Sequence, residues 1–282
     1  MPNQKNIPLE DEVGDVLEKA MRGTGINLDA LAADAAVPAA RIRDAVDYRS
    51  DLGGDELRRI AGVLGLNEVG LCALGAGHYP LPEARTLPFR VWPLRMRHGI
   101  GVANAYLVAE AGAAHGLLFD TGAGIAALEV AWPVEIRAVA AIFLTHVEGE
   151  HAGGLGAVLA RFGAPAAHVP RGAGAPGGRA MGEGETKVFG ELAVTAYSTP
   201  GHAAAHNCYL VRAPAEAGRS GLLISGDLVF AGSAGGGYFS PQQLRAQVAR
   251  ILGAMPPETV IAPGHGPLTT VENELKFNPF AL

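Results

Sequence analysis

The sequence predicts an α/β protein in which a small all-helical domain precedes a four-layer α/β/β/α sandwich. Two observations lead to this fold class. Up to residue 75, apolar residues recur at three- and four-residue steps, as one face of an amphipathic helix requires. Beyond residue 88, short apolar runs alternate with glycine-containing turns and a few amphipathic stretches, which is typical of two sheets covered by helices. At 282 residues, the chain is long enough for one large and one small domain.

Residues 1–75 are predicted to form the helical domain. Asn27 is a suitable N-cap residue, Pro38 suits the first turn of a helix, and Gly65 suits a helix end. The order of these helices resembles the small helix-turn-helix domains of phage-repressor type over residues 13–74.

The charge of this domain argues against a nucleic-acid partner. In phage-repressor domains the element at residues 38–47 would enter the DNA groove, and here it carries two aspartates beside its two arginines. Residues 1–75 hold 8 basic and 13 acidic side chains, a net charge of −5, which repels phosphate. We therefore expect this domain to cover a site as a lid or to form a homodimer, and we expect no nucleic-acid partner.

The larger domain is assigned to residues 89–282, after a proline-containing linker at residues 76–88. Helices are expected at residues 151–163 and 240–254. Residues 171–185 are rich in glycine and are expected to form a mobile loop. Strands are expected in nine runs: residues 89–96, 103–110, 115–120, 138–146, 166–170, 187–199, 206–213, 221–227 and 259–265.

Composition limits the remaining classes of function. The whole chain has a net charge of −6 with acids and bases interspersed, unlike a general nucleic-acid binder or a protein drawn to anionic membranes. Cys72 and Cys208 lie far apart and outside any CxxC pair, so neither a disulfide framework nor a thiolate zinc site is expected. The polar N-terminus differs from a signal peptide, and no run approaches the roughly 18 apolar residues of a membrane span. We expect a cytoplasmic protein with no membrane partner.

The segment THVEGEHAGG, residues 145–154, carries the densest group of metal-binding side chains. Within six positions it places four of them: His146, Glu148, Glu150 and His151. Side chains at i and i+2 of an extended segment point the same way, and the glycine between the glutamates lets the chain turn toward a second point. Imidazoles and carboxylates packed this closely are costly unless they are paired or bound to a metal.

Three further strand ends carry side chains of the same kind. They are His202 and His206 in TPGHAAAH, Asp227 in SGD, and His265 in APGHGP. Each follows a strand-like run and stands beside glycine, where the backbone can approach a metal closely. A lone histidine is more often structural than a ligand, but four strand ends of this kind in one chain predict a metal site.

Together these motifs are similar to those of the metallo-β-lactamase superfamily. LFDTGAG, THVEGEHAGG, TPGH, SGD and PGHGP occur in the order and spacing of that family over residues 88–282. The ending PGHGPLTTVENELKFNPF looks like the glyoxalase II branch, which hydrolyses thioesters. The resemblance implies two divalent metal ions. It assigns His146, Glu148 and His202 to the first ion, Glu150, His151 and His265 to the second, and Asp227 to both.

The resemblance also implies roles for residues beside the ligands. Asp120 in LFDTG matches the acid that orients a metal ligand. His206 matches a second histidine of many glyoxalase II-like chains, and we expect it to support a ligand or to contact the substrate. Glu150, Asp227 and His206 are the predicted catalytic residues.

Two ligand positions depart from the family's usual HxHxDH motif, because this chain has HVEGEH. Glu148 replaces a histidine and Glu150 replaces an aspartate, and a carboxylate at the first of these positions is shared with the flavodiiron branch, whose motif is HxExDH. Hard oxygen ligands shift metal preference from zinc toward iron or manganese. Three carboxylates against two divalent cations leave one positive charge, which a single hydroxide neutralises. Zinc, iron and manganese all stay open.

Two classes of reaction stay open, together with a regulatory role. The first is hydrolysis of a small thioester or other ester by a metal-bound hydroxide. The resemblance does not extend to the helical domain that binds glutathione in glyoxalase II. The second is oxygen or redox chemistry at a di-iron centre, as in the flavodiiron or sulfur dioxygenase branches. Glu148 favours this second class, but the chain has no room for a flavodoxin domain. The third possibility is a metal-dependent sensor that uses the helical domain.

Several residues near the predicted site are weaker candidates. Three basic side chains precede a glycine-rich turn that could border a cleft: Arg95, Arg97 and His98. Tyr238 and Phe239 follow a glycine run and are expected to pack in the core, although they could line the pocket. Asn104 is assigned a structural role.

Overall fold

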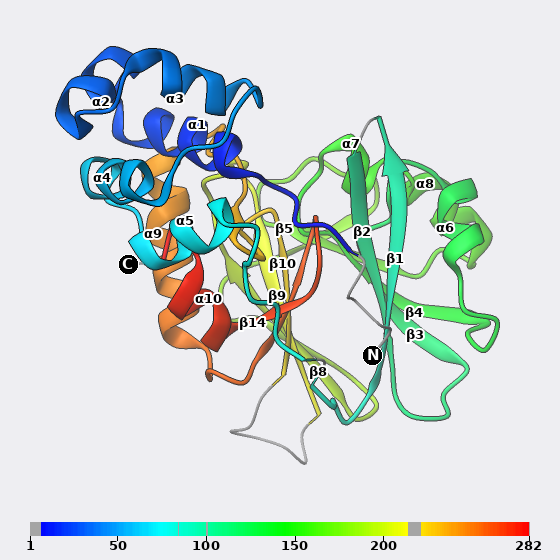
Figure 1. The fold of residues 1–282 in the computed structure, drawn as a ribbon. Helices are drawn as coiled ribbons and strands as arrows, with labels where there is room; N and C mark the ends of the chain where they lie inside the picture. The colour runs from blue at the N-terminus through cyan, green and yellow to red at the C-terminus, as the bar shows by residue number, and fades with distance from the viewer. Residues whose placement is uncertain (1–6, 84, 100, 214–220, 282) are drawn as a thin grey trace.

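The computed structural model describes residues 7–83, 85–99, 101–213 and 221–281. Two mixed sheets lie face to face with helices on the outer side of each, and a lobe formed by helices α1 to α5 sits over one end (Figure 1). The predicted four-layer α/β/β/α sandwich with helices at its N-terminus is confirmed. Residues 1–6 of the predicted helical domain and residue 84 of the predicted linker lie outside the described residues. Within the described residues, no helix is long and apolar enough to cross a membrane.

The first sheet has the strand order β1-β2-β3-β4-β5-β6. Its strands are β1 (Arg90–His98), β2 (Gly101–Ala109), β3 (His115–Phe119), β4 (Ala138–Phe143), β5 (Ala166–Pro170) and β6 (Gly178–Met181). β1, β2 and β3 pair antiparallel, whereas β3 to β6 run parallel. Parallel neighbours need crossover connections, and α6 (Ile125–Ala131) and α8 (Leu155–Arg161) supply two of them. The short helix α7 (Gly149–Ala152) precedes α8.

The second sheet has the strand order β14-β13-β10-β9-β8-β7. Its strands are β7 (Thr186–Phe189), β8 (Leu192–Ser198), β9 (Asn207–Arg212), β10 (Leu222–Gly226), β13 (Val260–Pro263) and β14 (Thr269–Thr270). Only β10 and β13 pair in parallel, and α9 (Pro241–Ala254) connects them; α10 (Val271–Phe277) follows β14. Between β10 and α9 lies a small ribbon of β11 (Val229–Phe230) and β12 (Ser233–Ala234).

Aromatic rings fill the space between the two sheets. Phe119 of β3 and Phe143 of β4 stack with their ring centroids 5.1 Å apart, and Tyr209 of β9 meets Phe143 edge-on at 5.3 Å. The hydroxyl of Tyr209 donates to the carbonyl oxygen of Leu144 at 2.8 Å, so the polar end of this buried ring is satisfied. The contact joins the second sheet to the end of β4, where the ligand-bearing segment begins.

The lobe consists of α1 (Val13–Thr24), α2 (Leu28–Ala35), α3 (Ala39–Val46), α4 (Gly54–Leu64) and α5 (Glu68–Gly75). Two of the predicted helix boundaries are present. The side chain of Asn27 caps α2 by accepting a backbone N–H of its first turn at 2.9 Å, and Gly65 ends α4 with a φ of 59°. The apolar pattern forms a core of its own, in which Leu17 and Leu31 are fully buried.

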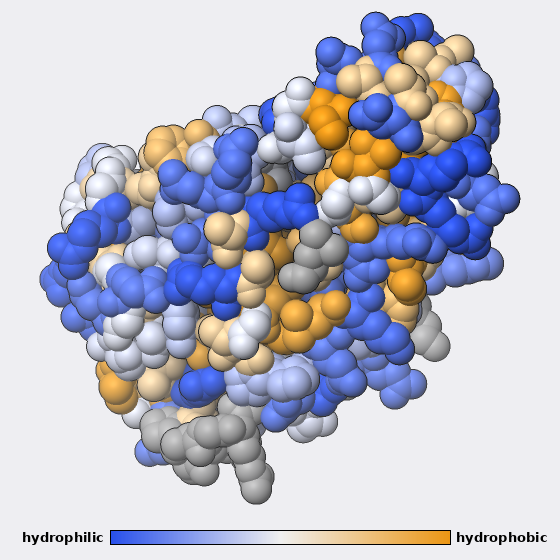
Figure 2. All heavy atoms as spheres, turned by 90° about the vertical axis from the view of Figure 1, so that its left-hand side faces the viewer, coloured by the Kyte–Doolittle hydropathy of each residue, from blue (hydrophilic) through white to orange (hydrophobic). Residues whose placement is uncertain are grey.

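Hydrogen bonds and apolar contacts hold the lobe on the sandwich. The hydroxyl of Tyr79 donates to Glu274 Oε2 at 2.9 Å, and the N–H of Asn67 donates to the carbonyl oxygen of Pro279 at 2.8 Å. Hydrophobic residues also gather where the lobe, at the upper right of Figure 2, meets the body. A mainly apolar cavity of about 550 Å³ lies between α1 and α9.

Residues 171–185 differ from the expected mobile loop. They include β6, which pairs in parallel with β5 and brings the fully buried side chain of Met181 into the core between the sheets. A strand of four residues at a sheet edge is held by backbone hydrogen bonds and one anchoring side chain. It therefore needs little of the apolar alternation by which a strand is recognised in sequence.

Two helix glycines offer a matched test of how tightly the lobe is docked. An added Cβ at Gly70 of α5 would lie 1.7 Å from the carbonyl oxygen of Phe277 in α10, whereas one at Gly62 of α4 meets no atom within 4 Å. We expect Gly62→Ala to stabilise the protein by about 0.5–1 kcal/mol, because alanine is the better helix former. We expect Gly70→Ala to destabilise it by about 1–3 kcal/mol, because α5 must move off α10. Urea denaturation measures both, and equal effects of the two changes would contradict the packing.

Candidate metal centre

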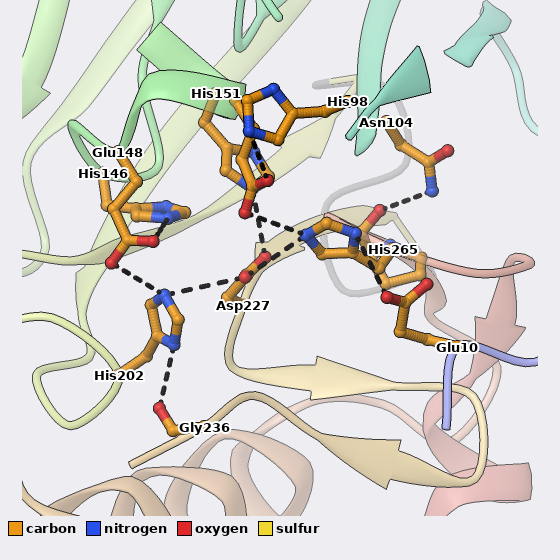
Figure 3. A network of polar contacts seen from close by, with 12 residues as sticks. Glu10, His98, Asn104, His146, Glu148, His151, His202, Asp227, Gly236 and His265 are labelled. Carbon is orange, nitrogen blue, oxygen red and sulfur yellow. Dashed lines mark hydrogen bonds and ion pairs between the residues drawn. The ribbon is translucent and has the colours of Figure 1, made fainter. Parts of the chain in front are cut away.

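The predicted ligands come together at one end of the two sheets (Figure 3). They stand on segments that follow four different strands, β4, β8, β10 and β13. After β4 come His146, Glu148, Glu150 and His151; after β8 comes His202; after β10 comes Asp227; after β13 comes His265. The structure divides them into two groups.

The first group consists of His146, Glu148 and His202, with one ligand atom of each within 4.8 Å of the others. Glu148 Oε1 lies 3.2 Å from His202 Nε2, and Glu148 Oε2 lies 4.0 Å from His146 Nε2. The close approach of the His202 imidazole lowers the pKa of Glu148, so its carboxylate is charged at neutral pH. Two imidazoles and one carboxylate therefore face one point.

The second group consists of Glu150, His151, Asp227 and His265, whose ligand atoms meet the same 4.8 Å limit. Glu150 Oε1 lies 3.7 Å from His265 Nε2 and 4.0 Å from His151 Nε2. His151 is fully buried, while the side chain of Glu150 is partly exposed. The glutamate therefore reaches the group from the open side.

Asp227 lies between the two groups. Its Oδ1 is 3.5 Å from His151 Nε2, and its Oδ2 is 3.5 Å from His265 Nε2 and 3.6 Å from His202 Nε2. Burial alone would raise the pKa of Asp227, but attraction to His151 and the hydrogen bond with His265 hold it well below its usual value. A charged carboxylate at this position can bridge two cations.

Hydrogen bonds at Nδ1 orient all four imidazoles. Nδ1 of His146 lies 3.0 Å from Thr145 Oγ1, and Nδ1 of His151 lies 3.2 Å from Asp120 Oδ2. Nδ1 of His202 lies 2.9 Å from the carbonyl oxygen of Gly236, and Nδ1 of His265 lies 3.0 Å from the carbonyl oxygen of Val102. With a proton on Nδ1, each ring turns the lone pair of Nε2 toward the centre. This is the arrangement of metal-ligating histidines.

Several of the inward-facing atoms are buried and have no hydrogen-bond partner among the described residues. They are Nε2 of His146, His151 and His202 and Oδ1 of Asp227. Buried polar atoms without partners are costly, so four of them around one space need an explanation. Imidazole nitrogens and carboxylate oxygens are ligands of zinc, iron and manganese, and the residues present therefore fit two such ions.

Two glycines of the motifs allow the ligand loops to approach one another. An added Cβ at Gly264 would lie 2.1 Å from Asp227 Oδ1. At Gly226, whose φ is +49°, it would lie 2.7 Å from the Cβ of Thr145. The glycines in SGD and PGHGP are thus explained by close packing around Asp227.

Asp120 stands behind the second group and has a φ of 59°, in the left-handed region. Its Oδ1 accepts the backbone N–H of Thr145 at 2.8 Å. Its Oδ2 accepts the hydroxyl of Thr145 at 2.9 Å and Nδ1 of His151 at 3.2 Å. One carboxylate thus fixes both the backbone of the ligand segment and the ring of His151.

His206, one of the three predicted catalytic residues, is buried behind Asp227 and does not line the cleft. It is only 2% exposed, and both ring nitrogens are engaged: Nδ1 with Thr199 Oγ1 at 2.7 Å and Nε2 with the backbone N–H of Asp227 at 3.2 Å. Burial lowers its pKa to about 3, which keeps it neutral. This burial fits the expected support of a ligand, here Asp227, rather than contact with a substrate.

Two of the weaker candidates border the centre. His98 Nε2 lies 3.5 Å from Glu150 Oε2, and Tyr238, expected in the core, is 69% exposed with its ring edge-on to His202 at 5.4 Å. The expectation of core packing was wrong for Tyr238 and also for Phe239, which is 53% exposed. Asn104 has the structural role assigned to it, since its side chain donates to the carbonyl oxygen of Pro263 at 3.0 Å.

A cleft of about 520 Å³ opens over both groups, and the helical lobe forms one of its walls. The residues that the lobe contributes include Glu10, Glu18, Lys19 and Arg22. The lid role expected of the helical domain concerned the domain as a whole, and none of these four residues was predicted to line a cleft. Their local pattern is that of a polar N-terminus and a solvated helix face, and only the docking of the lobe brings them to the cleft.

Residues 98–265 match the family described as the Metallo-beta-lactamase superfamily. Among curated proteins, the hydroxyacylglutathione hydrolase of Enterobacter sp. strain 638 is 29% identical over 126 residues, which are 44% of this chain and 47% of that protein. The chain thus spans about half the length of the curated relatives it matches.

Solved structures share the fold. A metallo-beta-lactamase from Staphylococcus aureus has a TM-score of 0.57 at 17% identity, over 67% of this chain and 62% of that one. The protein TTHA1623, solved in a di-iron-bound form, has a TM-score of 0.50 at 27% identity, over 66% of this chain and 98% of that one.

Asp120→Asn tests whether that carboxylate orients a ligand. The change keeps the size of the side chain but removes the acceptor charge beside His151, so we expect metal affinity to fall about 10–100-fold. Competition with a chelator measures the affinity. Asp29→Asn, on the exposed side of α2, is the control and should bind like the unchanged protein. Unchanged affinity of Asp120→Asn would contradict the role.

Metal uptake should depend on pH through His265. Burial alone would lower the pKa of His265, but the hydrogen bond with Asp227 outweighs it and raises the pKa to about 9 in the metal-free protein. The ring is then protonated at pH 7, and a metal ion must displace that proton. We expect affinity to rise about tenfold per pH unit from pH 7 and to level off near pH 9, in titrations followed by elemental analysis. A flat profile over this range would contradict the assignment of His265 as a ligand.

Proposed function

Because this chain belongs to the metallo-β-lactamase superfamily, we propose that it is a metal-dependent hydrolase with two divalent ions, acting on a small thioester or another ester. The observation that carries the proposal is the convergence of both ligand groups on Asp227 beneath an open cleft. Two such ions would lower the pKa of water enough to produce a nucleophile and would polarise the substrate carbonyl.

The burial of the ligands sets the direction from which a substrate approaches. His146, His151 and Asp227 are buried, whereas the side chains of Glu148 and Glu150 are 44% and 25% exposed. The two glutamates therefore stand where the cleft opens, and the buried ligands close the centre from behind. A substrate carbonyl would enter from the glutamate side, between the lobe and the sandwich.

The proposed substrate is a small molecule, because the cleft volume of about 520 Å³ lies in the range of ordinary ligand pockets. The curated relatives named hydroxyacylglutathione hydrolase support a thioester. Since this chain spans only about half of their length, the proposal stops at the thioester class and does not extend to the glutathione part.

Glu148 favours a second candidate function, oxygen or redox chemistry at a di-iron centre. It gives the first group a carboxylate beside His202, and oxygen ligands favour iron and manganese over zinc. The similar protein solved with two irons supports iron binding in a related fold.

The lobe is proposed to have no nucleic-acid partner. On α3, Arg41 is paired with Glu56 at 3.0 Å. Beyond its end, Arg49 is paired with Asp44 at 2.9 Å and Asp47 at 2.7 Å. Arginines paired in this way have little charge left for phosphate. A metal-dependent sensor that reads DNA through this lobe is thus the least supported alternative.

The deciding experiment combines metal content with turnover. Protein purified without added metal is analysed for bound elements and then assayed with a panel of thioesters and lactones, with and without oxygen. The hydrolase proposal expects two ions per chain and oxygen-independent hydrolysis that a chelator abolishes. An iron-loaded protein that consumes oxygen and hydrolyses no member of the panel would establish the second candidate instead.

Glu148→His tests what the carboxylate does to metal choice. The change restores the histidine of the usual family motif, so we expect the zinc-to-iron ratio of the bound metal to rise severalfold in cells grown with both metals. Glu148→Ala should lose about one ion per chain, because two imidazoles alone hold the first ion poorly. Elemental analysis measures both variants. An unchanged metal ratio in Glu148→His would show that other features decide the metal.

A further inference from the structure

The N-terminal segment passes beside the turn that carries His265 before it enters α1 (Figure 1). A Cβ added at Gly266, the residue after His265, would lie 3.3 Å from the backbone nitrogen of Glu10. The neighbouring Asp11 is bonded to Ser233 Oγ and to Lys19 Nζ. This stretch of chain is therefore anchored on the sandwich at both the His265 turn and the β11–β12 ribbon.

Glu10 points from this segment toward the metal centre (Figure 3). Its Oε1 lies 3.6 Å from Nδ1 of His265, the nitrogen that faces away from the ligand groups. The same Nδ1 is 3.0 Å from the carbonyl oxygen of Val102. His265 thus has a neutral acceptor from β2 and a carboxylate from the N-terminal segment on one side, and Asp227 and Glu150 on the other.

We propose that Glu10 is a positioning residue of the metal centre, and that docking of the N-terminal segment and metal binding by the second group strengthen each other. The inference rests on the proposed two-ion site and goes beyond it, because it makes the helical lobe a part of that site. Glu10 is not proposed as a ligand.

The physical reason is the carboxylate–histidine–metal arrangement. A carboxylate near Nδ1–H holds the imidazole in one orientation and makes Nε2 a stronger donor to a cation. Coupling of this kind is reciprocal, so a cation on Nε2 makes the N–H more positive and attracts Glu10 more strongly. Glu10 lies 3.6 Å from Nδ1 of His265 in the structure, and a bound ion would tighten the contact.

Contacts of α1 extend from the N-terminal segment toward the first group. Lys19 Nζ donates to the carbonyl oxygen of Ala234 at 2.8 Å. One turn further, the guanidinium of Arg22 lies 5.6 Å from the ring centre of Tyr238, whose ring meets His202. Leu17 packs α1 into the core of the lobe, so the segment continues directly into a helix of that core. The wall that α1 presents to the cleft thus depends on the same docking.

The test compares two isosteric changes in the full-length protein. Glu10→Gln removes the charge beside His265, and Glu12→Gln removes an equal charge two residues away, on the residue that caps α1. Metal affinity is measured by chelator competition with zinc and with manganese. We expect Glu10→Gln to lower the affinity for one of the two ions about tenfold. This is the low end of the range for such partners, because the carbonyl oxygen of Val102 still accepts from Nδ1 of His265. Glu12→Gln should bind both ions as the unchanged protein does.

A second readout separates positioning from a merely structural role. Hydrogen exchange of residues 8–20 is followed with and without metal. In the unchanged protein and in Glu12→Gln, metal should slow exchange in this segment, and in Glu10→Gln that added protection should be largely lost. The melting temperature of the metal-free protein should be the same for both variants, while the metal-induced rise is smaller in Glu10→Gln.

The outcomes are distinct from those of the functional proposal. If Glu10→Gln binds both ions normally and metal still protects the segment, the coupling is refuted even where the protein hydrolyses thioesters. If two ions bind with the expected Glu10 dependence and no ester or thioester is hydrolysed, the coupling stands and the hydrolase proposal fails. If the unchanged protein binds neither zinc, manganese nor iron(II), both are refuted.

Discussion

The buried carboxylate of Asp227 is the constraint on which the rest of the centre depends. Three imidazoles, those of His151, His202 and His265, lie within 3.6 Å of its oxygens. A buried negative charge is stable only when positive charge and hydrogen bonds surround it closely. Loops from both sheets must therefore bring their side chains to one point. The backbone N–H of Asp227 is held in turn by His206, which explains why a histidine without access to the cleft stands in the middle of the site.

The sandwich meets this requirement through hydrogen bonds between its sheets. The side chain of Asn104 and the hydroxyl of Tyr106, both on β2, donate to the carbonyl oxygen of Pro263 at 3.0 and 2.7 Å, directly before the His265 turn. On the other side, the backbone N–H of Asn207 donates to the carbonyl oxygen of Thr145 at 2.8 Å. Each sheet thus fixes a ligand loop of the other. Ligands held by backbone contacts need little rearrangement to receive a cation, which favours tight binding.

The helical lobe is in contact with the sandwich at several places around the cleft. It has its own core, yet it is anchored at the C-terminal segment through Asn67, at the β11–β12 ribbon through Lys19, and near His265 through Glu10. Of these residues, Lys19 and Glu10 also line the cleft. The resemblance to helix-turn-helix domains stays a prediction, whereas the contacts of the lobe place it beside the cleft.

The sequence by itself predicted the sandwich and the candidate ligands, which the structure brings together. Long apolar runs predict strands, and motifs such as HVEGEH and PGHGP place histidines, carboxylates and glycines together whatever the rest of the chain does. Local sequence patterns did not predict the features that depend on contacts between distant segments. Within residues 171–185, Gly178–Met181 form an edge strand because the neighbouring strand β5 offers its hydrogen bonds. Tyr238 reaches the cleft and His206 supports Asp227 because of what surrounds them. The approach of Glu10 to His265 joins positions that only the docking of the lobe brings together. The local pattern of apolar residues shows which face of a segment is buried. Contacts between side chains of distant segments form only when those segments pack against each other in the folded protein.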